Sequence, residues 1–278
     1  MPSVPEPPDP PVPLHDVVSA AALRAMRSDA SACGPDDPAA WLRLRRNHYM
    51  SQETWDGLSP TERLQVMVHV VSASAERRKV ASHCSAAGVW SIPLIGPVPE
   101  QAEIVVPDRS AGRSPGVIRH RSQNCPKGVL HDGVWVTPPA RTAVDLARVR
   151  SLASGVAALD HVLHHRMASR AELIREQEAI PRGGRGRQRA RLAVALADEK
   201  SESAGESLSR VRLFELGYPR PTLQHEFHDE RGVFVGRPDM YWRQHKIIGE
   251  FDGRVKYPTR LTRNARETRV VPHVKLPA

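Results

Sequence analysis

Two blocks of β-prone sequence, at residues 103–136 and 223–251, alternate with longer stretches of helical pattern. Each block contains short runs rich in Val, Ile and aromatic residues, separated by Gly, Pro, Asn and Asp, which is typical of strands joined by turns. The other stretches repeat apolar residues every three or four positions, as amphipathic helices do. This alternation predicts an α/β chain, in which residues 103–136 form a small antiparallel sheet.

Capping residues predict where several helices begin. Ser59 is a good N-cap, Pro60 suits the first helical position and Glu62 stands at the capping-box position, so a helix should run from about Pro60 to Ala75. Further helices are expected at residues 17–26, 82–89, 138–146, 152–165, 169–177 and 203–216, and in a segment that ends near residue 197. Strands are expected at residues 223–228, 233–242 and 245–251, the first two joined by a hairpin.

The charge of the chain favours a polyanionic partner. Its formal net charge is +9 and its isoelectric point is near 10.0. Each phosphate contact by Lys or Arg releases condensed counterions, which makes DNA the natural candidate. The alternative is a chain that is merely rich in arginine.

Cysteine usage and hydropathy predict a cytoplasmic protein. Cys33, Cys84 and Cys125 are far apart and show no CxxC spacing, which fits a reduced compartment. There is no run of eighteen apolar residues, and the first thirteen residues carry seven prolines in place of a signal sequence. We therefore expect no membrane partner. The glycines at 183–186 lack the flanking strand and lysine of a phosphate loop, so we expect no nucleotide cofactor.

Two basic segments are candidates for binding nucleic acid. Arg43, Arg45 and Arg46 follow one another closely in the first, and the alternative is an ordinary basic strand edge. Arg185 and Arg187 belong to the second, residues 181–191, which holds five arginines and three glycines. The second segment predicts an interdomain hinge whose arginines grip phosphates, and the alternative is a solvated linker with a basic helix face.

A third cluster of interest consists of three histidines. His161 and His165 stand one helical turn apart, a spacing that can bind zinc, and His164 lies between them. No cysteine is nearby and the metalloprotease glutamate is missing. A hydrogen-bonded histidine cluster is therefore the preferred interpretation.

Four carboxylates could converge in the last third of the chain. Glu206 lies in the first turn of its helix, and Asp239 lies on the returning strand of the hairpin. Glu250 and Asp252 are two residues apart on the third strand and so share a face. Clustered carboxylates repel unless a hard divalent cation lies among them, and Mg²⁺ bound there activates water for phosphodiester hydrolysis. We therefore predict that Glu206, Asp239, Glu250 and Asp252 are both metal ligands and catalytic residues.

These residues resemble the PD-(D/E)XK nucleases, in particular the branch related to very-short-patch-repair endonucleases. Gly205-Glu206-Ser207, Arg237-Pro238-Asp239 and Ile247 to Gly253 carry the resemblance over roughly the last 80 residues. It implies a restriction-endonuclease-like mixed sheet flanked by helices, with the helix glutamate, the Asp after proline and the acidic strand-end pair binding metal.

The nuclease lysine expected two residues after Glu250 is replaced by Asp252. Lys256 is the candidate catalytic base or electrophile in its place, and the alternative is an exposed surface lysine. The resemblance extends to Tyr257, whereas the following residues lack the expected helix and strand. This departure predicts a truncated or frameshifted C-terminus.

The upstream region resembles AbiEi-type antitoxins and transcriptional regulators. The likeness is carried by Trp41 to Tyr49, Ser82 to Ala87 and Val136 to Leu146. It implies a winged-helix DNA-binding domain followed by a small α+β domain, with Arg43, Arg45 and Arg46 in the wing.

Five segments are therefore expected. They are a disordered Pro-rich tail at 1–16, a helical, degenerate winged-helix region at 17–100, a small α+β domain at 101–180, an Arg-rich hinge and helix at 181–200, and a nuclease-like domain at 201–278. The expected activity is Mg²⁺-dependent hydrolysis of DNA. The alternatives are an antitoxin-type DNA-binding regulator with an inert nuclease-like domain, and a decayed fragment without activity.

Overall fold

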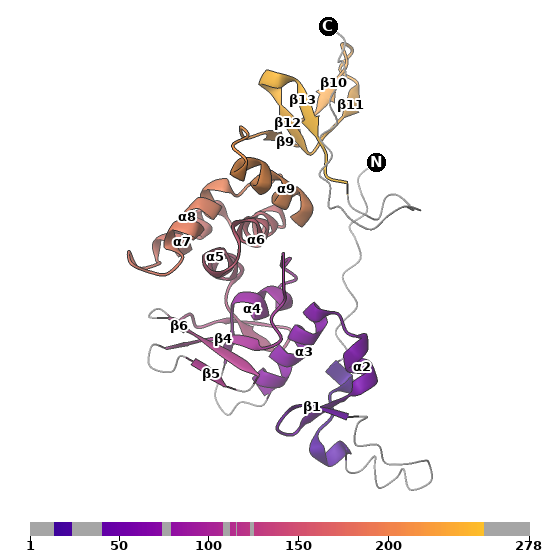
Figure 1. Cartoon of the computed structure of the whole chain (residues 1–278), viewed down its shortest axis with the longest axis vertical. Coiled ribbons are helices and arrows are strands. Elements are labelled where there is room, and N and C mark those ends of the chain that lie inside the picture. Colours follow the sequence, from indigo (N-terminus) through magenta and orange to yellow (C-terminus); the bar gives the residue numbers. More distant parts are fainter. Residues whose placement is uncertain are drawn as a thin grey trace. The chain divides into compact units, whose positions relative to one another are not determined.

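The computed structural model describes residues 14–23, 41–73, 79–107, 112–114, 116–122 and 125–252 (Figure 1). Contacts divide the chain into two compact units. Unit 1 comprises Met1–Ser91 and Pro97–Pro138, and unit 2 comprises Ile92–Gly96 and Pro139–Ala278. Both units contain helices and strands, which confirms the α/β fold class.

Among the described residues of unit 1, the first named elements are a short 3-10 turn, η1 (Leu14–Asp16), and a β-hairpin. The hairpin pairs β1 (Trp41–Arg45) with β2 (His48–Ser51), and helices α2 (Gln52–Gly57) and α3 (Pro60–Ala73) follow it. The predicted capping box begins α3: the Ser59 amide donates to Glu62 Oε2 at 2.7 Å, and the Glu62 amide donates to Ser59 Oγ at 3.3 Å. The start of this helix is therefore confirmed.

A six-stranded sheet forms the rest of unit 1, in the order β5-β6-β4-β3-β8-β7. Its strands are β3 (Val80–Ala81), β4 (Ala102–Pro107), β5 (Gly112–Ser114), β6 (Val117–Ser122), β7 (Val129–His131) and β8 (Val134–Val136). Helix α4 (His83–Val89) packs against β4, as does α3.

The prediction of a purely antiparallel sheet is wrong. Strand β4 pairs with β6 in parallel, and β3 pairs with β8 in parallel. Strand β5 turns the chain back between β4 and β6, so these two run in the same direction. Strand β3 contributes only two residues, which is too short for its alternation to be recognised in the sequence.

Unit 2 is built around helix α6 (Leu152–His164), which is buried along most of its length. It packs against α5 (Pro139–Val149), α8 (Arg187–Leu196) and α9 (Ala204–Glu215), and α7 (Arg170–Glu178) lies against α5 and α8 (Figure 1). A helix that is apolar on every side is suited to this central place.

Residues 181–200, predicted as an Arg-rich hinge and helix, lie within unit 2. Gly186 caps α8 with a φ of 77°, and a Cβ at this position would collide with the backbone of Arg148 in α5. The glycine therefore allows the backbone of α8 to approach that of α5 closely.

The C-terminal strands of unit 2 are shorter than expected. They are β9 (Thr222–Leu223), β10 (Phe227–His228), β11 (Phe234–Gly236), β12 (Met240–Trp242) and β13 (Ile247–Gly249), with a 3-10 turn, η5 (Arg243–His245), before β13. Strands β13, β12 and β9 form an antiparallel sheet, and β10 and β11 form a separate hairpin. The mixed sheet of the chain thus lies in unit 1, and the described C-terminal strands are antiparallel.

In the part of the chain that the structure describes, no helix is long and apolar enough to cross a membrane.

Candidate functional site

Glu206 lies at the start of α9, where it completes a helix cap. The Ser203 hydroxyl accepts a hydrogen bond from the Glu206 amide at 3.2 Å and donates one to Glu206 Oε1 at 2.7 Å. The Glu202 amide donates to Glu206 Oε2 at 3.0 Å. Burial raises the pKa of Glu206, and the nearby carboxylate of Asp239 adds to this rise, whereas the hydrogen bonds from Glu202 and Ser203 oppose it.

Asp239 precedes β12 and lies beside the end of β13. The antiparallel register places Met240 opposite Gly249, and Asp239 Oδ2 accepts a hydrogen bond from the Phe251 amide at 2.8 Å. The pairing of β12 with β13 thus carries Asp239 to the end of β13. Glu206 Oε2 and Asp239 Oδ1 both lie 3.4 Å from one nitrogen atom, Nε2 of Gln224, so the two carboxylates are neighbours.

Gln224 joins these two carboxylates and was missed in the sequence. Its Nε2 lies 3.4 Å from Glu206 Oε2 and 3.4 Å from Asp239 Oδ1. Its backbone has a φ of 50°, a left-handed conformation that costs free energy in a residue with a side chain. A single uncharged Gln after a strand gives no signal in a sequence, so only the fold reveals it.

Glu250 and Asp252 are exposed, and neither joins the pair formed by Glu206 and Asp239. Strand β13 ends at Gly249, so the alternation expected to align Glu250 with Asp252 does not continue. Within the described ranges, no group of three or more His, Cys, Asp or Glu side chains is arranged to hold a metal ion. His161, His164 and His165 are among the described residues, so these three histidines are not arranged to hold a metal ion either. Lys256 lies outside the described residues.

An open groove with a volume of about 510 Å³ runs beside the acidic pair. Gln224 lines it together with Lys200, His225 and Arg237. Arg237 is paired with Glu202 at 2.9 Å, so the groove carries charges of both signs.

Five arginines at the ends of α5 and α8 form a second candidate site, which we call the arginine surface: Arg148, Arg150, Arg185, Arg187 and Arg189. Main-chain carbonyl groups fix several of these side chains. Arg148 Nε donates to the Arg185 carbonyl at 3.2 Å, and Arg189 Nη1 donates to the Arg150 carbonyl at 3.0 Å. Arg148 also pairs with the buried Asp145 at 3.2 Å. Arg185 and Arg189 are exposed. The loop and helix of the basic segment thus place Arg185 and Arg189 beside Arg148 and Arg150 at the end of α5, while Arg187 contacts the end of α7.

The β1–β2 hairpin carries the third group of predicted residues. Arg43 and Arg46 are exposed, whereas Arg45 is half-buried and its Nη1 atom is inaccessible to solvent. Asn47 adopts a φ of 65° in the turn, and its side chain accepts a hydrogen bond from the Ala20 amide at 3.0 Å. Only two of the three hairpin arginines are therefore free to contact a partner.

Comparison with known proteins places a similarity in the middle of the chain. Residues 84–194 match the model of the AbiEi antitoxin C-terminal domain. Two proteins of Mycobacterium tuberculosis, Uncharacterized protein MT2308 (strain CDC 1551 / Oshkosh) and Uncharacterized protein Rv2248 (strain ATCC 25618 / H37Rv), are each 35% identical to the chain over 120 residues. That stretch covers 43% of this chain and 44% of each relative, so the chain spans less than half the length of these relatives. The match runs from α4 to α8 and supports the predicted AbiEi-like resemblance at Val136 to Leu146 and, from Cys84 onward, at Ser82 to Ala87. The predicted segment from Trp41 to Tyr49 lies outside the match.

Proposed function

We propose that this chain is a DNA-binding regulator of the antitoxin type, and that the arginine surface contacts the DNA backbone. The observation that carries this proposal is that all five arginines of the surface lie within the segment similar to the AbiEi antitoxin C-terminal domain. Guanidinium groups suit phosphate because they are always charged and present several donors in a fixed plane. The net charge of +9 favours the same partner.

Backbone carbonyl groups preorganise this surface. Arg189 is fixed by the Arg150 carbonyl, and Arg187 Nη1 donates to the Glu178 carbonyl at 3.3 Å. Side chains that are already ordered lose less conformational entropy on binding. We assign the main phosphate contacts to Arg187 and Arg189, which these carbonyl groups order, and to Arg185, which is exposed beside them.

We propose that Arg43 and Arg46, the exposed arginines of the β1–β2 hairpin in unit 1, also contact the DNA backbone. The resemblance of Trp41 to Tyr49 to AbiEi-type regulators implies that this hairpin is a wing, and arginines on a wing can contact the DNA backbone. Because Arg45 is half-buried, we expect it to support the hairpin and to make no phosphate contact.

Fluorescence anisotropy with a labelled DNA duplex tests both surfaces. The triple variant Arg185→Gln, Arg187→Gln, Arg189→Gln should bind more weakly than the wild type, and the double variant Arg43→Gln, Arg46→Gln should show a smaller loss. Arg212→Gln is the matched control, because this arginine is exposed on α9 and paired with Glu215 at 2.8 Å. Unchanged affinity in the triple variant would exclude the arginine surface as a DNA contact.

A second function, Mg²⁺-dependent hydrolysis of DNA, is favoured by the geometry of Glu206, Gln224 and Asp239. Gln224, which contacts both carboxylates, has a left-handed backbone conformation, and such conformations cluster at functional sites. The oxygen atoms of these carboxylates suit Mg²⁺, and Glu206 and Asp239 would hold it. Glu250 and Asp252, which are exposed and lie outside this pair, and Lys256, which lies outside the described residues, remain proposed catalytic residues. The bound cation would supply Lewis-acid activation of the phosphodiester and of a water molecule.

A plasmid-nicking assay with and without Mg²⁺ separates the two functions. Cleavage that is lost in Asp239→Ala and in Glu250→Ala supports the enzyme and this ligand set, and Glu215→Gln is the control. Cleavage that survives both variants contradicts the assigned residues. DNA binding without cleavage supports the regulator alone.

A further inference from the structure

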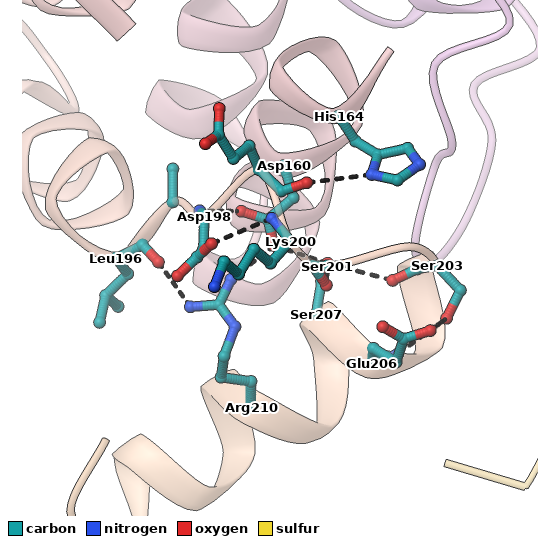
Figure 2. A network of polar contacts seen from close by, with 12 residues as sticks. Asp160, His164, Leu196, Asp198, Lys200, Ser201, Ser203, Glu206, Ser207 and Arg210 are labelled. Atoms are coloured by element: carbon teal, nitrogen blue, oxygen red, sulfur yellow. Dashed lines mark hydrogen bonds and ion pairs between the residues drawn. The ribbon is translucent and has the colours of Figure 1, made fainter. Parts of the chain in front are cut away.

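Asp160 on α6 is the centre of a buried polar network that reaches α9 (Figure 2). Its side chain is 1% exposed and accepts hydrogen bonds from three groups. The Asp198 amide donates to Oδ1 at 2.7 Å, while Ser207 Oγ at 2.7 Å and Arg210 Nη2 at 2.5 Å donate to Oδ2. We call Asp160, Asp198, Ser207 and Arg210 the Asp160 network.

The charges of this network depend on one another. A buried carboxylate or guanidinium is unfavourable unless it is paired and hydrogen-bonded. Arg210 is 9% exposed, and its other terminal nitrogen, Nη1, donates to the Leu196 carbonyl at 2.5 Å. Asp160 therefore attaches α9 both to α6 and to the C-terminal end of α8.

The network holds both ends of the segment that leads into α9. Asp198 lies before that segment and Ser207 lies in the first turn of the helix, and both bind the same carboxylate. Within the segment, Ser201 Oγ lies 2.9 Å from Ser207 Oγ. The chain between Asp198 and Ser207, which contains Glu206, is thereby fixed at both of its ends.

Ser207 directly follows Glu206 in the chain. Because the network fixes Ser207, it also fixes the main-chain position from which the Glu206 side chain extends. From that point the carboxylate reaches the Ser203 cap and Gln224. A chain of direct contacts thus runs from Asp160 through Ser207 to the acidic pair of Glu206 and Asp239. Asp160 itself belongs to the segment similar to the AbiEi domain, whereas α9 follows that segment.

We propose that Asp160 is a positioning residue for Glu206, through which a helix of the AbiEi-like segment sets the geometry of the acidic pair. The geometry of the acidic pair matters only if the second candidate function, Mg²⁺-dependent hydrolysis of DNA, holds, so the proposal rests on that function. The positioning itself can be measured without cleavage.

Amide hydrogen exchange of the full chain, followed by NMR, tests the positioning. In Ser207→Ala the start of α9 loses its bond to Asp160, whereas Arg210, one turn further along the helix, keeps its own bond, so the chain should stay folded. We expect at least a tenfold faster exchange at the amides of Glu206 and Ser207, with unchanged exchange in the middle of α6. Ser209→Ala is the matched control, because Ser209 is also buried on α9 and lies outside the network. It should leave the exchange at Glu206 unchanged.

Asp160→Asn provides a second, stronger perturbation that keeps the volume of the side chain. It should increase exchange at Glu206 at least as much as Ser207→Ala, and the double variant should add little to Asp160→Asn because both changes act on one contact. Wild-type exchange at Glu206 in folded Ser207→Ala, or an equal increase in Ser209→Ala, would overturn the proposal.

Cleavage kinetics distinguish a failure of this proposal from a failure of the enzyme. If the wild type cleaves DNA, Ser207→Ala should lower kcat and leave KM for DNA unchanged, since Ser207 does not line the groove. If the wild type does not cleave, the enzymatic function fails, and the exchange rates still decide whether Asp160 positions Glu206.

Discussion

The buried carboxylate of Glu103 on β4 accepts a hydrogen bond at 2.9 Å from Nε2 of His120 on β6. The ring of His83 stacks on that of His120 with centroids 3.7 Å apart, and the Cys84 amide donates to the same carboxylate at 2.8 Å. Burial alone raises the pKa of Glu103, but His120, His83 and the Cys84 amide outweigh it, so this pKa lies below the ordinary value of 4.5.

This arrangement predicts that unit 1 loses stability in acid. Because the pKa of Glu103 is lowered in the folded state, its ionised carboxylate stabilises the fold fully above pH 4.5. This stabilisation is lost as the pH falls through the lowered pKa of the folded state. Glu103→Gln should reduce the free energy of unfolding at neutral pH by about 1.5–3 kcal/mol, as expected for a bond to a charged group. It should also flatten the acid limb of the stability curve. Urea unfolding at several pH values checks this, with exposed Glu100→Gln as control. An unchanged acid limb in Glu103→Gln would count against it.

His161 should titrate well below the ordinary range for histidine. Burial and the neighbouring His165 and His164 lower its pKa from 6.5 to about 4. Because the unfolded chain binds this proton more readily, stability should be intact above pH 6.5 and should fall as the pH decreases from 6.5 towards 4. His161→Gln should weaken this pH dependence. An NMR titration of the His161 imidazole measures its pKa directly, and a midpoint near 6.5 would contradict the predicted lowering of this pKa.

Gly186→Ala should destabilise unit 2 because the new Cβ would collide with the backbone of Arg148 and the φ of 77° is unfavourable for alanine. We expect a loss of at least about 2 kcal/mol in the free energy of unfolding. Gly183→Ala is the control, since a Cβ there has no heavy atom within 4 Å. Urea unfolding compares the two variants, and equal stabilities would contradict the packing role of Gly186.

Gln224→Glu should make the acidic pair sensitive to divalent cations. A third carboxylate beside Glu206 and Asp239 adds repulsion, which should lower the melting temperature in EDTA relative to Gln224→Ala. Mg²⁺ should restore part of the loss, because a cation that binds the folded chain stabilises it. Thermal unfolding in both conditions measures the effect. A melting temperature of Gln224→Glu that does not respond to Mg²⁺ would argue against a cation site here.

Local signals in the sequence predicted much of the helical structure. The capping residues Ser59 and Glu62 mark the start of α3, and Ser169 and Glu172 form a complete capping box on α7. These signals depend on residues within one helical turn of each other, so no tertiary information is needed.

The strands were predicted less well, because their limits depend on tertiary contacts. The expected strand over residues 223–228 is interrupted at Gln224, whose φ of 50° no sequence pattern indicates. The parallel pairing of β4 with β6 likewise depends on where β5 inserts.

Of the predicted acidic site, the structure brings together Glu206 and Asp239, which are linked by Gln224. Glu250 was expected to share a face with Asp252 from the strand alternation, but β13 ends one residue before Glu250. The contact between Asp160 and Arg210 joins residues 50 positions apart, and such a pair has no local sequence signature.

The salt dependence of DNA affinity tests the central proposal most directly. The logarithm of the association constant should fall linearly with the logarithm of salt concentration, with a slope of about −0.9 for each phosphate contacted. In the triple variant Arg185→Gln, Arg187→Gln, Arg189→Gln the slope should become less steep by about 2.7, and Arg212→Gln should keep the wild-type slope. Identical slopes for the triple variant and the wild type would contradict the proposal that the arginine surface binds DNA.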